Sequence, residues 1–167
     1  MQHDFVVTIP IRPKGKDRPR HGPGGVDEDG KEKRVTYTTT ATRQWEARMA
    51  IAVQEKIGSV LLQPPIRLDI LMVVARPQYM CFQYKATGEY KFPTGLVWCD
   101  KRPDRDNVEK NVMDALKTFW ADDSQVVSGE VLKAFAEIGH GPRVIVRIRT
   151  ETRHPKDVAE SLGLIVP

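Results

Sequence analysis

The chain has 167 residues, of which 40% are hydrophobic and 29% are charged, and its formal net charge is +4. This length suits one domain that buries a core without a disulfide framework or a structural metal. No run approaches the roughly 18 apolar residues of a membrane span, and the opening MQHDFVVTIP lacks the basic and apolar regions of an export signal. We therefore expect a soluble, cytoplasmic protein that contacts no membrane.

Cys81 and Cys99 are the only cysteines, and neither has a CxxC spacing or a neighbouring histidine pair. Isolated thiols argue against both a zinc site and a disulfide framework. The small positive net charge is compatible with a polyanionic partner and also with an ordinary domain. The distribution of the charges is therefore more informative than their sum.

A first strand is predicted at residues 4–11, where Phe5, Val7 and Ile9 recur with a period of two. The next stretch, RPKGKDRPRH at residues 12–21, mixes lysine and arginine with proline and glycine. Proline and glycine exclude a helix there, so we expect a basic loop.

A turn-rich segment, GPGGVDEDG at residues 22–30, predicts a mobile hairpin tip or an insertion. Residues 35–39 predict a short strand that pairs with the first one. From residue 42 the apolar residues recur at helical spacing up to Gly58, which predicts a first helix with Thr40 or Thr42 as its N-cap.

Residues 66–75, IRLDILMVVA, are apolar on both faces and predict a strand in the middle of a sheet. Residues 76–95 then mix proline and glycine with tyrosine, phenylalanine and two lysines. Such rings can stack on nucleobases while lysines neutralise phosphates. The same rings are equally consistent with a long loop that folds onto the body of the protein.

A second helix is predicted at residues 108–119 from apolar side chains at helical spacing. Residues 126–137 and 143–150 predict two strands joined as a hairpin by the turn IGHGP at residues 138–142. On the last strand three arginines share one face and Val144, Val146 and Ile148 the other. We expect an α+β fold with a mixed sheet and two principal helices, formed by residues 1–154 and followed by a C-terminal tail, residues 155–167.

Two acidic pairs flank the second predicted helix, in the stretch KRPDRDNVEKNVMDALKTFWADDSQV at residues 101–126. Pro103 favours extended backbone before it, and if the extension continues, Asp104 and Asp106 face the same side. Asp106, with Glu109 three residues later, also fits a helix N-cap with a capping box. Lys110 follows one helical turn after Asp106 and points toward the same patch.

Carboxylates around an open position suit Mg²⁺, which prefers oxygen ligands, retained waters and a substrate phosphate. A bound Mg²⁺ polarises a phosphate and activates water, and a lysine offsets the charge that develops in the transition state. The stretch therefore favours a metal-dependent nuclease.

Each of these residues also has an ordinary structural explanation. Asp106 can be a helix cap alone, which contributes about 1 kcal/mol, and Asp122 and Asp123 are typical of a turn. Lys110 can be a solvated helix residue, and Asp114 is expected to be structural or to support the site from outside. The coincidence of all of them around one helix, in a chain with a basic loop, favours the nuclease.

The residues RPDRDNVEKNVMDAL, followed by ADDSQV, resemble the signature of the RusA family of Holliday-junction resolvases, small endonucleases of bacteria and their phages. The family pattern is Pro-Asp-x-Asp-Asn, a lysine four residues after the second Asp, Asp-Ala-Leu, and Asp-Asp-x-Gln-Val. The segment KGKDRPRH is similar to the family's Lys-Gly-Arg-Pro-Arg loop, with Lys16 and Asp17 interrupting it. The resemblance covers residues 4 to about 152, and segments 22–34 and 79–97 look long for the family.

The resemblance implies that Asp104, Asp106 and Asp123 are catalytic and hold Mg²⁺, that Lys110 is catalytic, and that Asp122 is the less certain acid. It also implies a homodimer that makes paired symmetric nicks across a four-way junction, in recombination and repair, with no small-molecule cofactor. Two rivals remain: a non-cleaving junction-binding protein, and a broader nuclease for branched DNA or flaps.

Phosphate contacts are predicted for basic residues of the loop and, more weakly, of the last strand. These residues are Lys14, Lys16, Arg18, Arg20, Arg143, Arg147 and Arg149.

Overall fold

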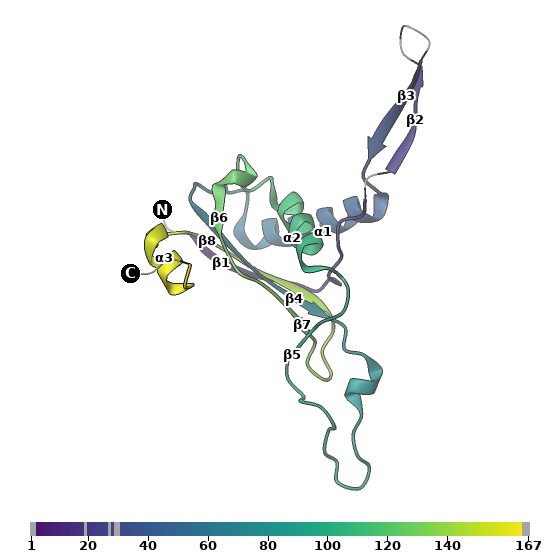
Figure 1. Ribbon diagram of the computed structural model, residues 1–167, viewed down its shortest axis with the longest axis vertical. Coiled ribbons are helices and arrows are strands. Elements are labelled where there is room, and N and C mark those ends of the chain that lie inside the picture. Colours follow the sequence, from purple (N-terminus) through teal and green to yellow (C-terminus); the bar gives the residue numbers. More distant parts are fainter. Residues whose placement is uncertain (1–2, 19, 27, 29–30, 165–167) are drawn as a thin grey trace.

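A mixed six-stranded sheet carries two long helices on one of its faces (Figure 1). The computed structural model describes residues 3–18, 20–26, 28 and 31–164. The strand order is β1-β8-β4-β7-β5, and β6 also pairs with β4. The strands are β1 (Asp4–Ile9), β4 (Ile66–Val74), β5 (Val97–Trp98), β6 (Val126–Ser128), β7 (Val131–Phe135) and β8 (Arg143–Thr150). The predicted α+β fold with a mixed sheet is confirmed.

Strand β4 lies in the middle of the sheet, as its apolar sequence predicts. It pairs antiparallel with β8 on one side and parallel with β6 and β7 on the other. The predicted hairpin between residues 126–137 and 143–150 is wrong, because β4 lies between β7 and β8. The turn at residues 138–142 instead carries the chain past the end of β4.

The predicted strand at residues 126–137 is interrupted at Gly129, which separates β6 from β7. Gly129 has a φ of +156°, and a Cβ atom there would lie 1.9 Å from the carbonyl oxygen of Leu68. Only glycine fits this close approach of two backbones.

The two long helices are α1 (Thr40–Ile57) and α2 (Arg105–Leu116). The N-cap of α1 is Thr39, whose hydroxyl accepts a hydrogen bond from the Thr42 amide at 3.3 Å. The predicted caps Thr40 and Thr42 are therefore wrong by one and three positions. The predicted end at Gly58 is confirmed, and its φ of +73° is typical of a helix C-terminus.

The core lies between these helices and one face of the sheet. Alternate residues of β4 and β8 point into it, together with a stripe from each helix. Its fully buried members include Met49, Val53, Ile66, Met72, Val108, Val112, Leu116, Val144, Val146 and Ile148. Burial of this apolar surface fixes the orientation of α2 and hence of its polar face.

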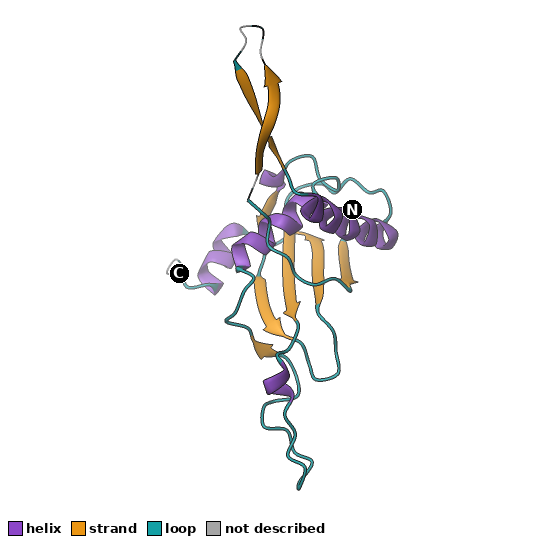
Figure 2. Cartoon of the chain, turned by 90° about the vertical axis from the view of Figure 1, so that its right-hand side faces the viewer, coloured by secondary structure: helices purple, strands orange, loops and turns teal. Residues whose placement is uncertain are grey.

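Two arms project from opposite ends of the body (Figures 1 and 2). The first is a hairpin of β2 (Arg20–Val26) and β3 (Glu32–Tyr37), in which Arg20 pairs with Tyr37. The prediction that residues 35–39 pair with the first strand is therefore wrong. Part of the predicted tip at residues 22–30 belongs to β2, whereas residues 27, 29 and 30 lie outside the described residues.

The second arm, residues 76–96, is called the aromatic arm below. It contains the short 3₁₀ helix η1 (Gln78–Cys81) and leads into β5. At its base Arg76 donates hydrogen bonds to the carbonyls of Ala136 (2.6 Å), Pro93 (2.7 Å) and Gly95. One guanidinium thus ties both ends of the arm to the body.

The C-terminal residues include a further short helix, α3 (Pro155–Ser161), capped by the side chain of His154. None of the helices in the described parts of the chain is long and apolar enough to cross a membrane.

Candidate active site

The basic loop at residues 12–18 lies directly on α2. The Lys16 amide donates to the Asn107 carbonyl at 3.1 Å, and the buried Asn111 side chain donates to the Lys14 carbonyl at 3.0 Å. A Cβ atom at Gly15 would lie 3.2 Å from the Cβ of Asn107, so glycine allows this close contact. These contacts hold the side chain of Lys16 beside the polar face of α2.

Asp17 anchors the loop to the start of α1. Its carboxylate accepts hydrogen bonds from the hydroxyls of Thr39 (2.5 Å) and Thr42 (2.9 Å) and pairs with Lys14 at 2.8 Å. The bond from Lys14, followed by those from the threonines, lowers the pKa of Asp17 to about 2. The acid that interrupts the family's basic loop therefore has a structural role.

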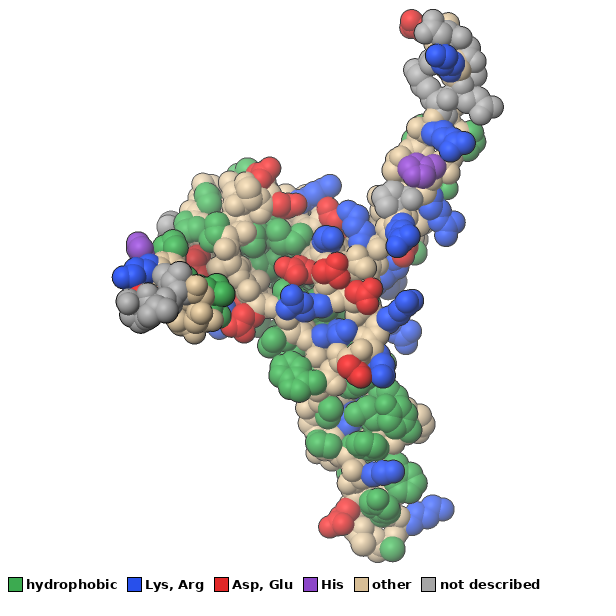
Figure 3. Space-filling view, in the orientation of Figure 1, with side chains coloured by type: hydrophobic (Ala, Val, Ile, Leu, Met, Phe, Trp, Pro, Cys, Tyr) green, Lys and Arg blue, Asp and Glu red, His purple; other side chains and the backbone are tan. Residues whose placement is uncertain are grey.

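A pocket of about 440 Å³ opens between this loop, α2 and the 3₁₀ helix η2 (Asp123–Gln125). Figure 3 shows acidic and basic side chains gathered on this face, between the two arms. The residues that line the pocket are Lys16, Asp106, Glu109, Lys110, Met113, Asp114 and Asp123. Lys16, from a loop far earlier in the sequence, thus shares one space with the charged side chains of α2 and η2, called the α2 pocket below.

Asp106, Lys110 and Asp114 are spaced by four residues along α2 and share one helix face. The Lys110 ammonium lies 3.8 Å from the Asp106 carboxylate, and both side chains are about two-thirds exposed, at 68% and 66%. A pair this long and this exposed is weak. Asp114 forms an ion pair with Lys16 instead.

Asp123 is held in the pocket by a neutral donor. The indole nitrogen of the buried Trp120 donates to its Oδ1 at 2.8 Å. This bond orients the carboxylate without adding a positive charge beside it. The negative charge of Asp123 therefore stays available to a cation.

Asp122 has a different environment from its neighbour. It is the N-cap of η2, accepts the Ser124 amide at 2.8 Å, and is not among the residues that line the pocket. The hydrogen bonds from Ser124 lower the pKa of Asp122. Of the two adjacent acids, Asp123 reaches the pocket and Asp122 holds the turn.

Asp104 is not among the residues that line the pocket. Helix α2 begins at Arg105, so its N-cap is Asp104, without a side-chain cap bond, and Asp106 lies in the first turn. The prediction that Asp106 is the N-cap is wrong, and so is the extended backbone that was expected to turn both carboxylates to one side.

The carboxylate oxygens of Asp106, Asp123 and Asp114 are the donors that a hard divalent cation such as Mg²⁺ prefers. The chemistry of the donor set therefore fits this ion. Among the residues that the structure describes, however, no group of three or more His, Cys, Asp or Glu side chains is close enough to hold a metal ion. The acids share a pocket without forming a closed ligand cluster.

Two acidic residues of the pocket, Asp114 and Glu109, were not expected to line it. Asp114 lies eight residues after Asp106, and this spacing alone could have placed both on one helix face. Glu46 of α1 lies near Asp114, and burial, followed by the charge of Asp114, raises the pKa of Glu46. The acidic surface thus extends from α2 toward α1.

The predicted arginines of β8 lie elsewhere, on the sheet face opposite the long helices. Each is paired with a carboxylate: Arg143 with Glu137 (2.7 Å), Arg147 with Asp4 (2.7 Å) and Arg149 with Asp69 (3.0 Å). The pairs Asp4–Arg147, Asp69–Arg149 and Glu151–Arg153 are called the arginine cluster below.

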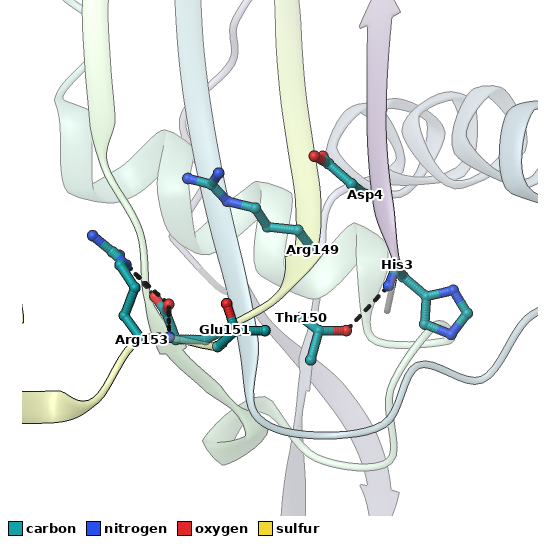
Figure 4. Close-up of a pocket in the computed structure, with 7 residues that line it drawn as sticks. His3, Asp4, Arg149, Thr150, Glu151 and Arg153 are labelled. Atoms are coloured by element: carbon teal, nitrogen blue, oxygen red, sulfur yellow. Dashed lines mark hydrogen bonds and ion pairs between the residues drawn. The ribbon is translucent and has the colours of Figure 1, made fainter. Parts of the chain in front are cut away.

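A second pocket, of about 380 Å³, lies where β1 begins and β8 ends (Figure 4). Asp4, Arg149, Glu151 and Arg153 line it, together with His3 and two threonines. Its carboxylates are engaged by arginines, as in the pair of Glu151 and Arg153 at 2.8 Å. This pocket therefore offers less free negative charge than the one on α2.

A protein-family model described as Endodeoxyribonuclease RusA matches residues 10–149. The match runs from the basic loop to β8 and includes every residue that lines the α2 pocket. No curated protein matches the chain. Members of the family are metal-dependent nucleases that bind branched DNA and cleave Holliday junctions. The chain therefore belongs to the RusA family and is an endodeoxyribonuclease.

Proposed function

We propose that this endonuclease resolves four-way junctions by paired symmetric nicks, with Mg²⁺ as its metal, in DNA recombination and repair. The observation that supports this is the α2 pocket, where Asp106 and Asp123 come from separate elements and Lys16 and Lys110 flank them. Carboxylates for a cation beside lysines for a phosphate are the groups that phosphodiester hydrolysis needs.

Asp106 and Asp123 would hold Mg²⁺, with Asp104 joining them from the N-cap of α2. When bound, the ion supplies a polarised phosphate and an activated water. Asp123 enters this arrangement already oriented by Trp120. Lys110, only loosely paired with Asp106, is free to move toward a phosphate and offset the charge that develops on it.

The DNA backbone would pass over the basic loop toward the hairpin arm. Arg18 and Arg20 are exposed where the loop enters β2 and suit phosphate contacts. Lys14 and Lys16 already pair with Asp17 and Asp114, so their contacts require exchange of partners. Arg143, Arg147 and Arg149 are weaker candidates, because each carries a carboxylate partner.

Two equivalent cuts require two equivalent sites, which a twofold homodimer supplies. The sheet face opposite the long helices offers surface for such an interface, because Val6 and Leu132 of that face are 52% and 40% exposed. Residues 1–154 would form the nuclease unit.

The decisive experiment uses a labelled four-way junction with and without Mg²⁺, and maps the nicks on all four strands. We expect symmetric nicks in opposed strands that require the metal. Junction binding without cleavage in any divalent metal would reject the enzyme. A panel of flaps, forks and single strands cut as fast as the junction would favour the broader nuclease.

Asp106→Asn provides the matched test of the metal role. We expect it to abolish cleavage and to keep or tighten junction binding, because it removes a negative charge near the phosphates. Loss of binding by a folded variant would contradict this role.

A further inference from the structure

The aromatic arm contains an open slot of about 610 Å³ near its base. Rings, amides and one ammonium group line it, and the residues that matter below are Gln78, Tyr79, Phe82, Gln83, Lys91 and Phe92. Figure 3 shows the hydrophobic side chains of this arm gathered on the same face as the acidic pocket.

The rings of the slot are exposed to an extent that folding alone does not explain. Tyr79 is 62% and Phe82 is 52% exposed. Tyr79 meets Phe92 edge to face, with ring centroids 6.1 Å apart, and Phe82 meets Tyr84 in the same way at 5.3 Å. These contacts fix the orientation of the rings while leaving much of their surface to a ligand.

The arm has its own hydrogen-bonded frame. Gln83 and Tyr90 form a β-bridge, the Lys91 amide donates to the Phe82 carbonyl at 3.0 Å, and the Gln83 side chain donates to the Gly88 carbonyl at 2.5 Å. Arg76 ties its base to the body. The slot is therefore built in advance of any ligand, which reduces the entropy lost on binding.

A path of positive charge joins the slot to the acidic pocket. Lys101, Arg102 and Arg105 follow β5 and are exposed, with Lys101 paired to Asp100 at 3.1 Å, and Lys110 lies in the pocket itself. Figure 3 shows basic side chains between the acidic cluster and the arm. Within the slot, the Lys91 ammonium lies 5.7 Å from the centroid of the Phe92 ring.

We propose that this slot binds an unpaired nucleobase of the branched DNA, a proposal that rests on the function proposed above. Exposed rings supply stacking surface, glutamine amides offer hydrogen bonds to a base edge, and the lysine and the basic path follow the phosphates. A protein partner fits less well, because the path toward the active site is positively charged and complementary to DNA. The slot holds a base that the branch point leaves unstacked while the pocket cuts the backbone.

The test compares the wild type with the double variant Tyr79→Ala, Phe82→Ala. The probe is a short thymidine oligonucleotide with one central 2-aminopurine, whose fluorescence falls when the base stacks. We expect the wild type to quench the probe. The variant should lose most of this quenching and bind the oligonucleotide at least about fivefold more weakly, since one stacked base contributes about 1 kcal/mol or more.

Ile51→Ala is the control, because Ile51 is an apolar side chain of α1 with a similar exposure of 55%. It should quench and bind like the wild type, and thermal unfolding should show that both variants fold. Equal quenching and affinity in the double variant would overturn the proposal. So would unchanged DNA binding accompanied by an altered oligomeric state in sedimentation, which would assign the arm to a protein contact.

Junction cleavage in Mg²⁺ by the wild type separates the two proposals. Quenching by a protein that cuts no junction supports the slot and rejects the proposed function. Cleavage by a protein whose double variant behaves like the wild type supports the proposed function and rejects the slot.

Discussion

The α2 pocket and the arginine cluster both contain acids beside basic groups, but Asp106 and Asp123 of the pocket are held less tightly than the acids of the cluster. In the arginine cluster, Arg147 donates two hydrogen bonds to Asp4, at 2.9 and 2.7 Å, and Arg153 donates two to Glu151. In the pocket, Asp123 is held by a neutral indole and Asp106 by a lysine 3.8 Å away.

This difference separates structural acids from available ones. A bidentate arginine satisfies a carboxylate and fixes its geometry, so little charge remains for another ligand. A neutral donor or a long lysine contact orients an acid and leaves its charge free. In this protein the partner of a carboxylate is therefore a better guide to its role than its exposure.

The largest expected effect distinguishes the two adjacent acids. Asp123→Asn should reduce junction cleavage by about 10²- to 10³-fold, because it removes a charged group that faces the reacting phosphate. Asp122→Asn should stay within about threefold of the wild type in the same assay, since Asp122 holds a turn and any loss should reach activity only through stability. Similar losses in both variants would remove the distinction between them.

The next largest effect is expected on stability, when an acid of the arginine cluster is replaced by an uncharged residue. Asp69 pairs with Arg149 and with Arg67, whose side chain is only 10% exposed. Asp69→Asn should lower the free energy of unfolding by about 2–3 kcal/mol, because it removes the nearest carboxylate charge from two partly buried guanidinium groups. Chemical denaturation measures this loss.

The same change in the pocket is the control for Asp69. Asp106→Asn should leave the free energy of unfolding unchanged, because its exposed pair with Lys110 contributes little. If both variants lost equal stability, the contrast between the two regions would fail.

A smaller effect is expected from the neutral donor to Asp123. Trp120→Phe should lower cleavage about tenfold, the usual effect of losing a group that orients a metal ligand. Trp45→Phe is matched to it, because Trp45 also donates one indole hydrogen bond, at 2.9 Å, to the carbonyl of Arg12. Equal cleavage rates in the two variants, measured on folded protein, would show that Trp120 has no special role in the site.

The smallest effect concerns pH. The pKa of Asp17 is about 2 in the folded protein, against 3.8 for an ordinary aspartate. Its ionised carboxylate therefore stabilises the fold fully above about pH 4, and this stabilisation is lost as the pH falls toward 2. Asp17→Asn should therefore show a smaller drop in melting temperature between pH 5 and pH 2.5 than the wild type. An equal drop in the variant and the wild type would contradict this role of Asp17.

Local sequence patterns predicted the long elements of the body. The apolar run of β4 indicated its central position, and the helical spacing of Val108 and Val112 indicated α2. The pairing of strands was harder to predict, because it depends on contacts between residues that are distant in the sequence. The turn at residues 138–142 suggested a hairpin, yet β4, from far earlier in the chain, lies between β7 and β8.

Glycine and proline are rare in strands, so the segment GPGGVDEDG at residues 22–30 predicts a hairpin tip or an insertion. Residues 22–26 nevertheless belong to strand β2, whose pairing with β3 shifts in register between Pro23 and Val26.

The sequence also predicted part of the candidate site. The spacing of Asp106 and Lys110 placed both on one helix face, as the structure has them. The choice between Asp122 and Asp123 could not be predicted from the sequence, because it depends on a hydrogen bond from Trp120. The position of Lys16 depends on how Gly15 and Asn107 fit together, which no periodicity encodes.

The hydrogen bonds from Arg76 to three carbonyls close the base of the aromatic arm, so the arm could be exchanged by design at this point. The arm also packs on the sheet through Met80 and Phe92, which join Cys99 and Phe135 in a small apolar cluster. An exchanged arm therefore needs apolar side chains at those two positions to leave the sheet and the acidic pocket intact. A resolvase scaffold with interchangeable arms would then allow substrate choice to be altered independently of catalysis.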